Sequence, residues 1–134
     1  MLGEKIGDSA GKISTRRVLG NSGSGPQVET SFATTGFLLG TEYREIGTYT
    51  AVMRPDGTLF GQGNGLLLGR DGDSATWTGQ GVGTIKSGGA VSYRGAIYFQ
   101  TTSPKWSRLN SVAGVFEFEA DADGNTKTQT WEWK

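Results

Sequence analysis

The sequence predicts an all-β chain of about eight antiparallel strands, joined in order and closed into an up-and-down barrel. Glycine makes up 23 of the 134 residues and proline only 3, which favours strands joined by tight turns. Apolar and polar residues alternate over segments of about ten residues, and no window carries the i, i+3, i+4 apolar stripe of an amphipathic helix. A closed barrel suits such a meander because it leaves no strand edge unpaired; a two-sheet sandwich is the alternative.

Four turn sequences delimit most of the strands: RPDG at 54–57, RDGD at 70–73, KSGG at 86–89 and DADGN at 121–125. Pro55 presets φ for a three-residue loop, and the Asp-Gly pairs at 71–72 and 123–124 suit two-residue hairpin loops. The predicted strands are Lys12–Leu19, Gln27–Leu38, Thr41–Met53, Thr58–Leu68, Ser74–Ile85, Ala90–Thr101, Val112–Ala120 and Thr126–Trp133.

One segment interrupts the alternation of strands and turns. The stretch SPKWSRLN at 103–110 predicts a turn of helix, capped by Ser103 with Pro104 at its first position. We expect this segment to plug one end of the barrel.

Two glycine-rich stretches, GQGNG at 61–65 and GQGVG at 79–83, lie in neighbouring predicted strands. Glycine at alternate strand positions indicates strong coiling, or close approach by aromatic rings, another backbone or a ligand. A two-residue Asp71-Gly72 loop would place Gln62 opposite Gly81, and a short link at 87–88 would place Arg94 opposite Gly81.

The predicted register divides the middle strands into two faces. The polar face predicts a binding site formed by Thr48, Thr50, Gln62, Asn64, Trp77, Arg94, Tyr98 and Gln100. The apolar face carries Tyr49, Met53, Leu59, Tyr93, Ile97 and Phe99. If the polar face points inward, Arg94 is the strong cation of a pocket for a carboxylate or enolate. If it points outward, the apolar face is an ordinary core; the sequence leaves both open.

The C-terminal hairpin alternates aromatic and acidic residues. A two-residue Asp123-Gly124 loop predicts that the aromatic residues share one face and that the glutamates share the other with two threonines. The first set is Phe116, Phe118, Trp131 and Trp133, and the second is Glu117, Glu119, Glu132, Thr128 and Thr130. Paired buried carboxylates could act as general acid and base, whereas a solvated face would have no such role.

Composition excludes several classes of function. Lys plus Arg and Asp plus Glu number 13 each, so no net field attracts nucleic acid. There is no cysteine or histidine, which argues against zinc sites and thiolate chemistry, and we expect neither metal nor cofactor. The N-terminal stretch lacks the apolar core of a secretory signal, and no apolar run is long enough to cross a membrane. We therefore expect one cytoplasmic domain, 1–134, with no membrane insertion.

Several stretches together resemble a family of small uncharacterised bacterial proteins: MLGEKIG, RPDGTLFGQG, ATWTGQGVG, VSYRGAIYFQT, LNSVAGVFEFEADADGN and WEWK. The resemblance spans nearly the whole chain, and in fold that family is similar to allene oxide cyclase. It implies an eight-stranded antiparallel barrel that forms oligomers, and it does not imply the cyclase activity. No catalytic motif of the cyclase matches here, so no site residue is carried over.

Three functions fit this sequence. The first is a barrel that binds a small hydrophobic or amphipathic molecule in its lumen. The second is a homo-oligomeric interaction module in contact through Tyr49, Tyr93, Ile97 and Phe99. The third is a cyclase or isomerase in which Arg94 and Tyr98 orient an oxygen while Gln62 and Asn64 donate hydrogen bonds.

Overall fold

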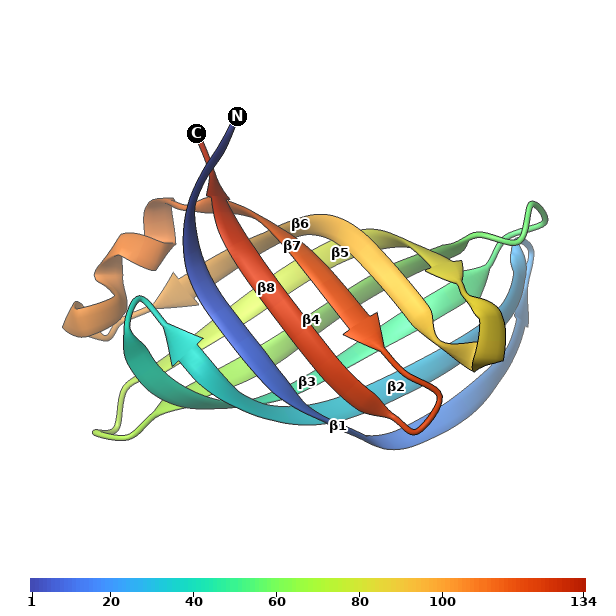
Figure 1. Ribbon diagram of the computed structural model, residues 1–134, viewed down its shortest axis with the longest axis horizontal. Helices are drawn as coiled ribbons and strands as arrows, with labels where there is room; N and C mark the ends of the chain where they lie inside the picture. The colour runs from blue at the N-terminus through green and yellow to red at the C-terminus, as the bar shows by residue number, and fades with distance from the viewer.

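The computed structural model describes residues 1–134 apart from the side chain of Ser22. Within this part of the chain, eight antiparallel strands close into a barrel in which each strand pairs with its sequence neighbours and β8 pairs with β1 (Figure 1). The strands are β1 (Leu2–Ser22), β2 (Gly25–Leu38), β3 (Thr41–Met53), β4 (Leu59–Gly69), β5 (Ser74–Ile85), β6 (Val91–Thr101), β7 (Ala113–Ala120) and β8 (Asn125–Trp133). The predicted closed barrel is confirmed, and the two-sheet sandwich is excluded.

β1 departs most from its predicted bounds. The alternation pattern predicts Lys12–Leu19, whereas β1 covers Leu2–Ser22. Its pairing with β8 shifts register twice before Gly7, and its pairing with β2 shifts twice after Ile13. Each such irregularity breaks the two-residue period of side chains. The first ten residues therefore show no continuous alternation in the sequence.

The loops after β3, β4, β5 and β7 each contain three residues. In the last of them Asp121 N donates to Asn125 O at 3.0 Å and Gly124 N donates to Asp121 O at 3.1 Å. The third loop residue is a left-handed glycine in every case: Gly57 at φ 87°, Gly72 at 85°, Gly89 at 87° and Gly124 at 84°. A left-handed third residue is typical of three-residue hairpin loops. The three-residue loop at 55–57 is confirmed, and the shorter loops predicted at 71–72, 87–88 and 123–124 are wrong.

One extra loop residue moves each pairing by one position. Gln62 therefore lies opposite Gln80, and Gly61 lies opposite Gly81. Arg94 lies opposite Val82 rather than Gly81. The error of one residue between β4 and β5 is undone by the error of one residue between β5 and β6. Most of the predicted polar residues of β3, β4 and β6 therefore still lie on the same face of the barrel wall.

The side chains of alternate residues divide into an inner and an outer face. The inner face holds two separate groups of buried apolar side chains. The first contains Ile6, Leu38, Tyr43, Leu67, Ala75, Trp106, Leu109 and Val112. The second contains Phe32, Leu59, Tyr93, Phe118 and Ala120. The core of the molecule is therefore the lumen itself.

The 3₁₀ helix η2 (Pro104–Ser111) closes one end of the barrel, at the left of Figure 1. Its Trp106 and Leu109 are fully buried against the first apolar group. The predicted plug with Pro at its first turn is confirmed. Ser103 makes no side-chain cap; its hydroxyl instead accepts a hydrogen bond from the Ser74 backbone N at 3.0 Å. The other end, which we call the mouth, is bordered by the loops after β1, β3, β5 and β7, and the loop after β5 contains the short 3₁₀ turn η1 (Ser87–Gly89).

The C-terminal hairpin does not group its side chains as predicted. Phe116 lies opposite Thr130 and Phe118 opposite Thr128, so each phenylalanine shares the inner face with a threonine. Glu117 and Glu119 point outward, where Arg94 lies 3.6 Å and 3.5 Å from their carboxylates. The remaining members divide between the faces, because Trp131 pairs with Val115 and Glu132 with Gly114. The predicted shared faces are wrong. Of the two alternatives for the carboxylates, the structure supports the solvated face for Glu117 and Glu119.

No helix in the described part of the chain is both long and apolar enough to cross a lipid bilayer.

Candidate functional site

The predicted site residues lie mostly outside the lumen. The alternation of exposure places Thr48, Thr50, Gln62, Asn64, Arg94, Tyr98 and Gln100 on the outer face. Trp77 lies on the inner face, opposite Gly65. The sequence left the direction of the polar face open, and the structure points it outward. The ligand-binding role of these residues remains a prediction.

Five of the predicted residues come together around a hollow on the outer wall. This outer hollow has a volume of about 690 Å³ and spans β2 to β6. Its lining contains Glu29, Thr48, Thr50, Gln62, Gly63, Asn64, Thr78, Gly79, Gln80, Ala96 and Tyr98. Arg94 and Gln100 are outside this lining. Arg94 donates to Ser92 Oγ at 2.9 Å and to Tyr93 O at 3.0 Å besides contacting its two glutamates.

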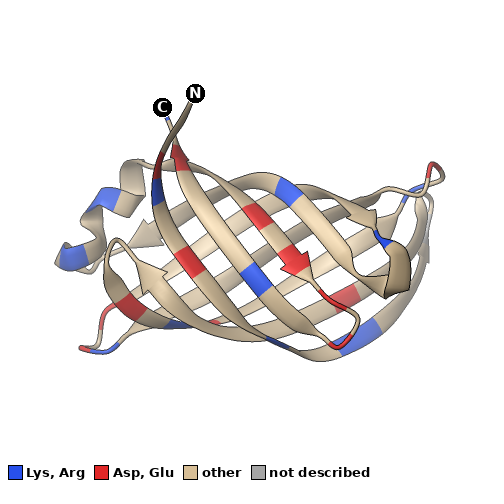
Figure 2. Ribbon diagram, viewed as in Figure 1, with Lys and Arg blue, Asp and Glu red and all other residues tan. Residues whose placement is uncertain are grey.

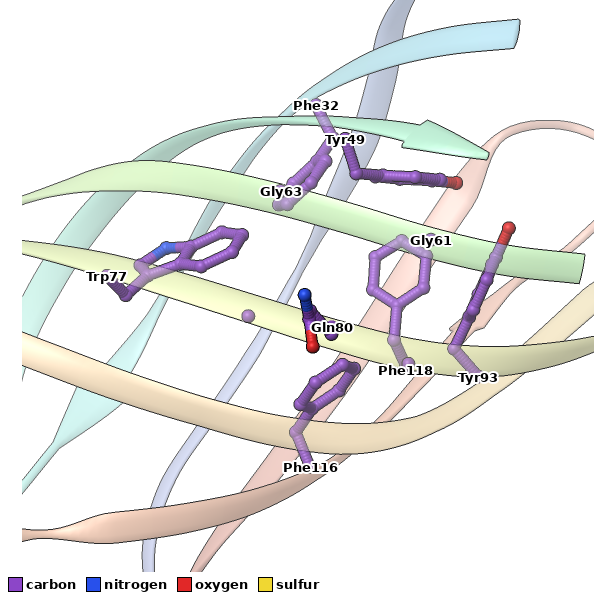
Figure 3. A pocket seen from close by; sticks show the side chains of 11 residues that line it. Phe32, Tyr49, Gly61, Gly63, Trp77, Gln80, Tyr93, Phe116 and Phe118 are labelled. Carbon is purple, nitrogen blue, oxygen red and sulfur yellow. The ribbon is translucent and has the colours of Figure 1, made fainter. Parts of the chain in front are cut away.

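Aromatic rings fill the middle of the lumen, as Figure 3 shows. The Tyr49 ring contacts Tyr93 edge-on at a centroid distance of 5.5 Å and Phe118 at 5.7 Å, an arrangement that aromatic pairs favour. The space left among the rings is only about 60 Å³. This part of the lumen is therefore a packed core with little room for a ligand.

The alternate glycines make room for these rings. A Cβ at Gly65 would lie 2.2 Å from Trp77 Nε1, and one at Gly83 would lie 2.6 Å from the Tyr93 ring. A side chain at either position would displace the ring, since such distances are far inside van der Waals contact. The glycine rows thus serve aromatic packing, one of the roles that their spacing predicts.

Glu45 is a buried carboxyl group inside the barrel, between the aromatic rings and the plug. Thr34 Oγ1 donates to Glu45 Oε1 at 2.7 Å, and Trp77 Nε1 donates to Glu45 Oε2 at 2.7 Å. Burial raises the pKa of Glu45, while the two hydrogen bonds act in the opposite direction. The group therefore resists ionisation and fixes the Trp77 indole over Gly65.

The sequence contains a signal for Glu45 that the predicted site leaves out. In TEYREIGTYT, Glu45 falls at the same parity as Tyr43 and Tyr49. Two residues of separation place side chains on the same face of a strand, so Glu45 had to share the face of those tyrosines. Once that face is the lumen, the carboxyl group is buried.

The mouth holds a second cavity of about 370 Å³. Most of its wall is apolar, and the lining contains Pro26, Val28, Ala51, Met53, Leu59, Ile85, Val91, Ala120 and Ala122. The polar groups are Arg16, Thr30, Asp121 and the phenols of Tyr49 and Tyr93. In Figure 3 both phenol oxygens lie on the side of the rings nearer the end of β3, which is the mouth.

The polar groups of the mouth differ in what they already bind. Asp121 accepts hydrogen bonds from Asp123 N and Asn125 N at 2.9 Å each and from Asn125 Nδ2 at 2.9 Å, so the turn uses its carboxylate. Burial raises the pKa of both Tyr49 and Tyr93, and both phenols stay protonated. Arg16 makes no ion pair with any residue that the structure describes.

The structure also revises the predicted interaction face. Tyr93 and Ile97 are 5% and 8% exposed, while Tyr49 and Phe99 pack against the two apolar groups of the lumen. These side chains belong to the core and cannot form a contact between protomers. That part of the oligomer hypothesis is wrong; the oligomeric state itself remains a prediction.

Comparison with known proteins gives the fold and no activity. No family model matches the sequence, and no curated protein matches it. Three solved structures superpose over nearly the whole chain. A protein of unknown function from Clostridium acetobutylicum has a TM-score of 0.84 at 15% identity, with 96% of each chain covered. A conserved protein of unknown function from Rhodopseudomonas palustris has a TM-score of 0.85 at 14% identity, covering 98% of this chain and 97% of that one.

The third structure is a β-barrel-like protein from Acinetobacter baumannii, with a TM-score of 0.85 at 16% identity over 100% of this chain and 96% of the other. At these identities the likeness shows the fold alone. The predicted resemblance to uncharacterised bacterial proteins agrees with these neighbours, whereas the link to allene oxide cyclase stays a prediction. The chain is thus similar to small bacterial barrels of unknown function.

Proposed function

We propose that this barrel binds a small amphipathic molecule in the cavity at its mouth. The observation that carries the proposal is a cavity of about 370 Å³ with mostly apolar walls at the open end of a barrel whose other end is plugged. Cavities of this size and lining are typical of small-molecule sites. The apolar wall would take the hydrocarbon part of the ligand.

Arg16 supplies the head-group interaction in this proposal. It lies at the rim of the cavity, in register with Thr30 of β2. A guanidinium with no carboxylate partner can form two parallel hydrogen bonds to an anionic oxygen pair. A ligand with a carboxylate or a similar anionic group at one end therefore fits best.

The aromatic rings limit how deep the ligand reaches. The space among them is about 60 Å³, which is too small for more than a few atoms. The protonated phenols of Tyr49 and Tyr93 form the floor, where they can donate hydrogen bonds. We expect the ligand to stop at this floor rather than pass through to Glu45.

The test is a fluorescence titration of the protein with dansyl-undecanoic acid, followed by competition with undecanoic acid and with undecanol. We expect Arg16→Met to weaken binding of the acid by about tenfold or more, because a charge-assisted pair is lost. The affinity for undecanol should be the same in the variant and in the wild type, since the apolar wall is unchanged.

Arg17→Met is the matched control. Arg17 follows Arg16 in the same strand but lies 3.3 Å from Glu29 in an ion pair at the outer surface. It should bind the acid as the wild type does. Absence of binding in the wild type, or an equal loss in both variants, would overturn the proposal.

A further inference from the structure

The outer face of two adjacent strands carries no charged residue. β4 and β5 contain no Lys, Arg, Asp or Glu along their full lengths, whereas β1, β7 and β8 carry several. Figure 2 shows the contrast, with the charged residues concentrated on the strands that face the viewer. The outer hollow lies on this uncharged part of the wall.

The hollow is rich in groups that both donate and accept hydrogen bonds. Thr48, Thr50, Gln62, Asn64, Thr78 and Gln80 line it. Each hydroxyl or amide can do both at once. Two of these groups are already in contact, since Gln80 Nε2 donates to Gln62 Oε1 at 3.3 Å, which leaves the amide N of Gln62 and the amide O of Gln80 for a ligand. The one charged lining residue, Glu29, is neutralised at the rim by Arg17.

An exposed aromatic ring completes the lining. Tyr98 is 55% exposed and lies opposite Thr78 in the sheet. The face of an aromatic ring carries partial negative charge, and the axial C–H groups of a sugar ring carry partial positive charge. A sugar can therefore stack on Tyr98 while its hydroxyls bond to the neighbouring amides and threonines.

We infer that the outer hollow binds a neutral oligosaccharide segment. The lining lacks the cations that a phosphate or a nucleic acid requires. It is also too polar for a purely apolar ligand, which would leave the amides unpaired. Neutral ligands with many hydroxyls match both properties.

A second copy of the chain fits the hollow less well. Two identical concave surfaces that face each other enclose unfilled space, and good interfaces are packed as densely as protein interiors. An extended oligosaccharide can follow the hollow across β3 to β6. This site is separate from the mouth and does not depend on the proposed function.

The experiment is isothermal titration calorimetry of the full chain with cellohexaose, maltohexaose and chitohexaose, with hexagalacturonate as the acidic counterpart. We expect binding to at least one neutral hexasaccharide and none to the acidic one. Tyr98→Ala and Gln62→Ala should each weaken that binding on the order of tenfold. Both variants should keep the far-UV circular dichroism spectrum and the urea unfolding midpoint of the wild type, which shows that they are folded.

Trp133→Ala and Gln129→Ala are the matched controls. Trp133 is 62% exposed, and both residues belong to β8, away from the hollow. They should leave hexasaccharide binding unchanged. The inference is overturned if no neutral hexasaccharide binds at millimolar concentration, if the controls lose as much affinity, or if light scattering finds a dimer that Thr78→Lys dissociates.

Discussion

Glu45 gives the stability of this barrel a pH dependence through its buried carboxyl group. Burial raises its pKa above the value in the unfolded chain, so the folded state holds a proton that the unfolded state releases. The contribution to stability is complete below the unfolded pKa and is lost as pH rises through the folded pKa. In Glu45→Gln the amide can still accept from Trp77 and donate to Thr34, without a titrating group.

We therefore predict that the unfolding free energy of the wild type, relative to Glu45→Gln, falls as pH rises from 4 to 8. Urea denaturation at several pH values measures it, with Glu117→Gln as the control for loss of an outer carboxylate. Parallel pH profiles for the wild type and Glu45→Gln would contradict the prediction.

The identity of the inner residues could be predicted only in part. Alternate glycines predicted close packing, and Gly65 beneath the Trp77 indole is an instance. The partner of each glycine could not be predicted, because it depends on register. Glu45 was missed because a carboxyl group in a strand is normally solvated, and only its two donors, Thr34 and Trp77, make its burial tolerable.

The bounds of most strands follow from the turns, whereas the pairing between strands does not. Cutting the sequence at its Asp-Gly and Gly-Gly turns predicted β2 to β8 to within two residues. An Asp-Gly pair fits both a two-residue loop and a three-residue loop that ends in a left-handed glycine. Choosing the shorter loop moved Trp77 to the wrong face and misplaced Trp131. One residue of loop length thus decides which side chains enter the lumen.

The plug helix η2 offers a direct test of how one element supports the barrel. Trp106 is fully buried although its indole N–H has no hydrogen-bond partner among the described residues, so its contribution comes from packing. We predict that Trp106→Ala lowers the unfolding free energy by roughly 3–5 kcal/mol. Trp133→Ala, at a 62% exposed position, should change it by less than about 0.5 kcal/mol.

Equilibrium unfolding in urea, monitored by far-UV circular dichroism, measures both variants. If Trp106→Ala costs no more than Trp133→Ala, the plug is not part of the cooperative core. The control is close in chemistry, because both substitutions remove an indole side chain.

The two ends and the two sides of the barrel are unlike. One end is filled by η2, and the other contains the cavity of the mouth. One side carries ion pairs, and the other carries the outer hollow, whose strands β4 and β5 contain no charged residue. The sequence predicted a meander that closes, but it could not assign these differences. Uncharged polar residues are found on either face of a strand, so their pattern does not show which face is the lumen. In the closed barrel the face with the glycine and aromatic residues points inward.

Closure also makes the barrel a ring in which the chain ends are neighbours. Met1 N donates to Lys134 O at 2.6 Å, and Lys134 N donates to Met1 O at 2.7 Å. A linker of a few residues can join them, after which the chain can be opened in the exposed loop at 55–57. Every strand then keeps both of its neighbours, and joining adjacent ends costs little loop entropy.

We predict that this circular permutant folds, with an unfolding free energy within about 2 kcal/mol of the wild type, and still binds dansyl-undecanoic acid. A second permutant opened between Gly63 and Asn64 should fail, because the break falls inside β4 and interrupts its pairing with both β3 and β5. Thermal unfolding and the fluorescence titration measure both. If the two permutants are equally stable, an unbroken β4 is not needed for the stability of the barrel, which contradicts the prediction. If neither permutant folds, folding depends on the order in which the strands are joined as well as on which strands are neighbours.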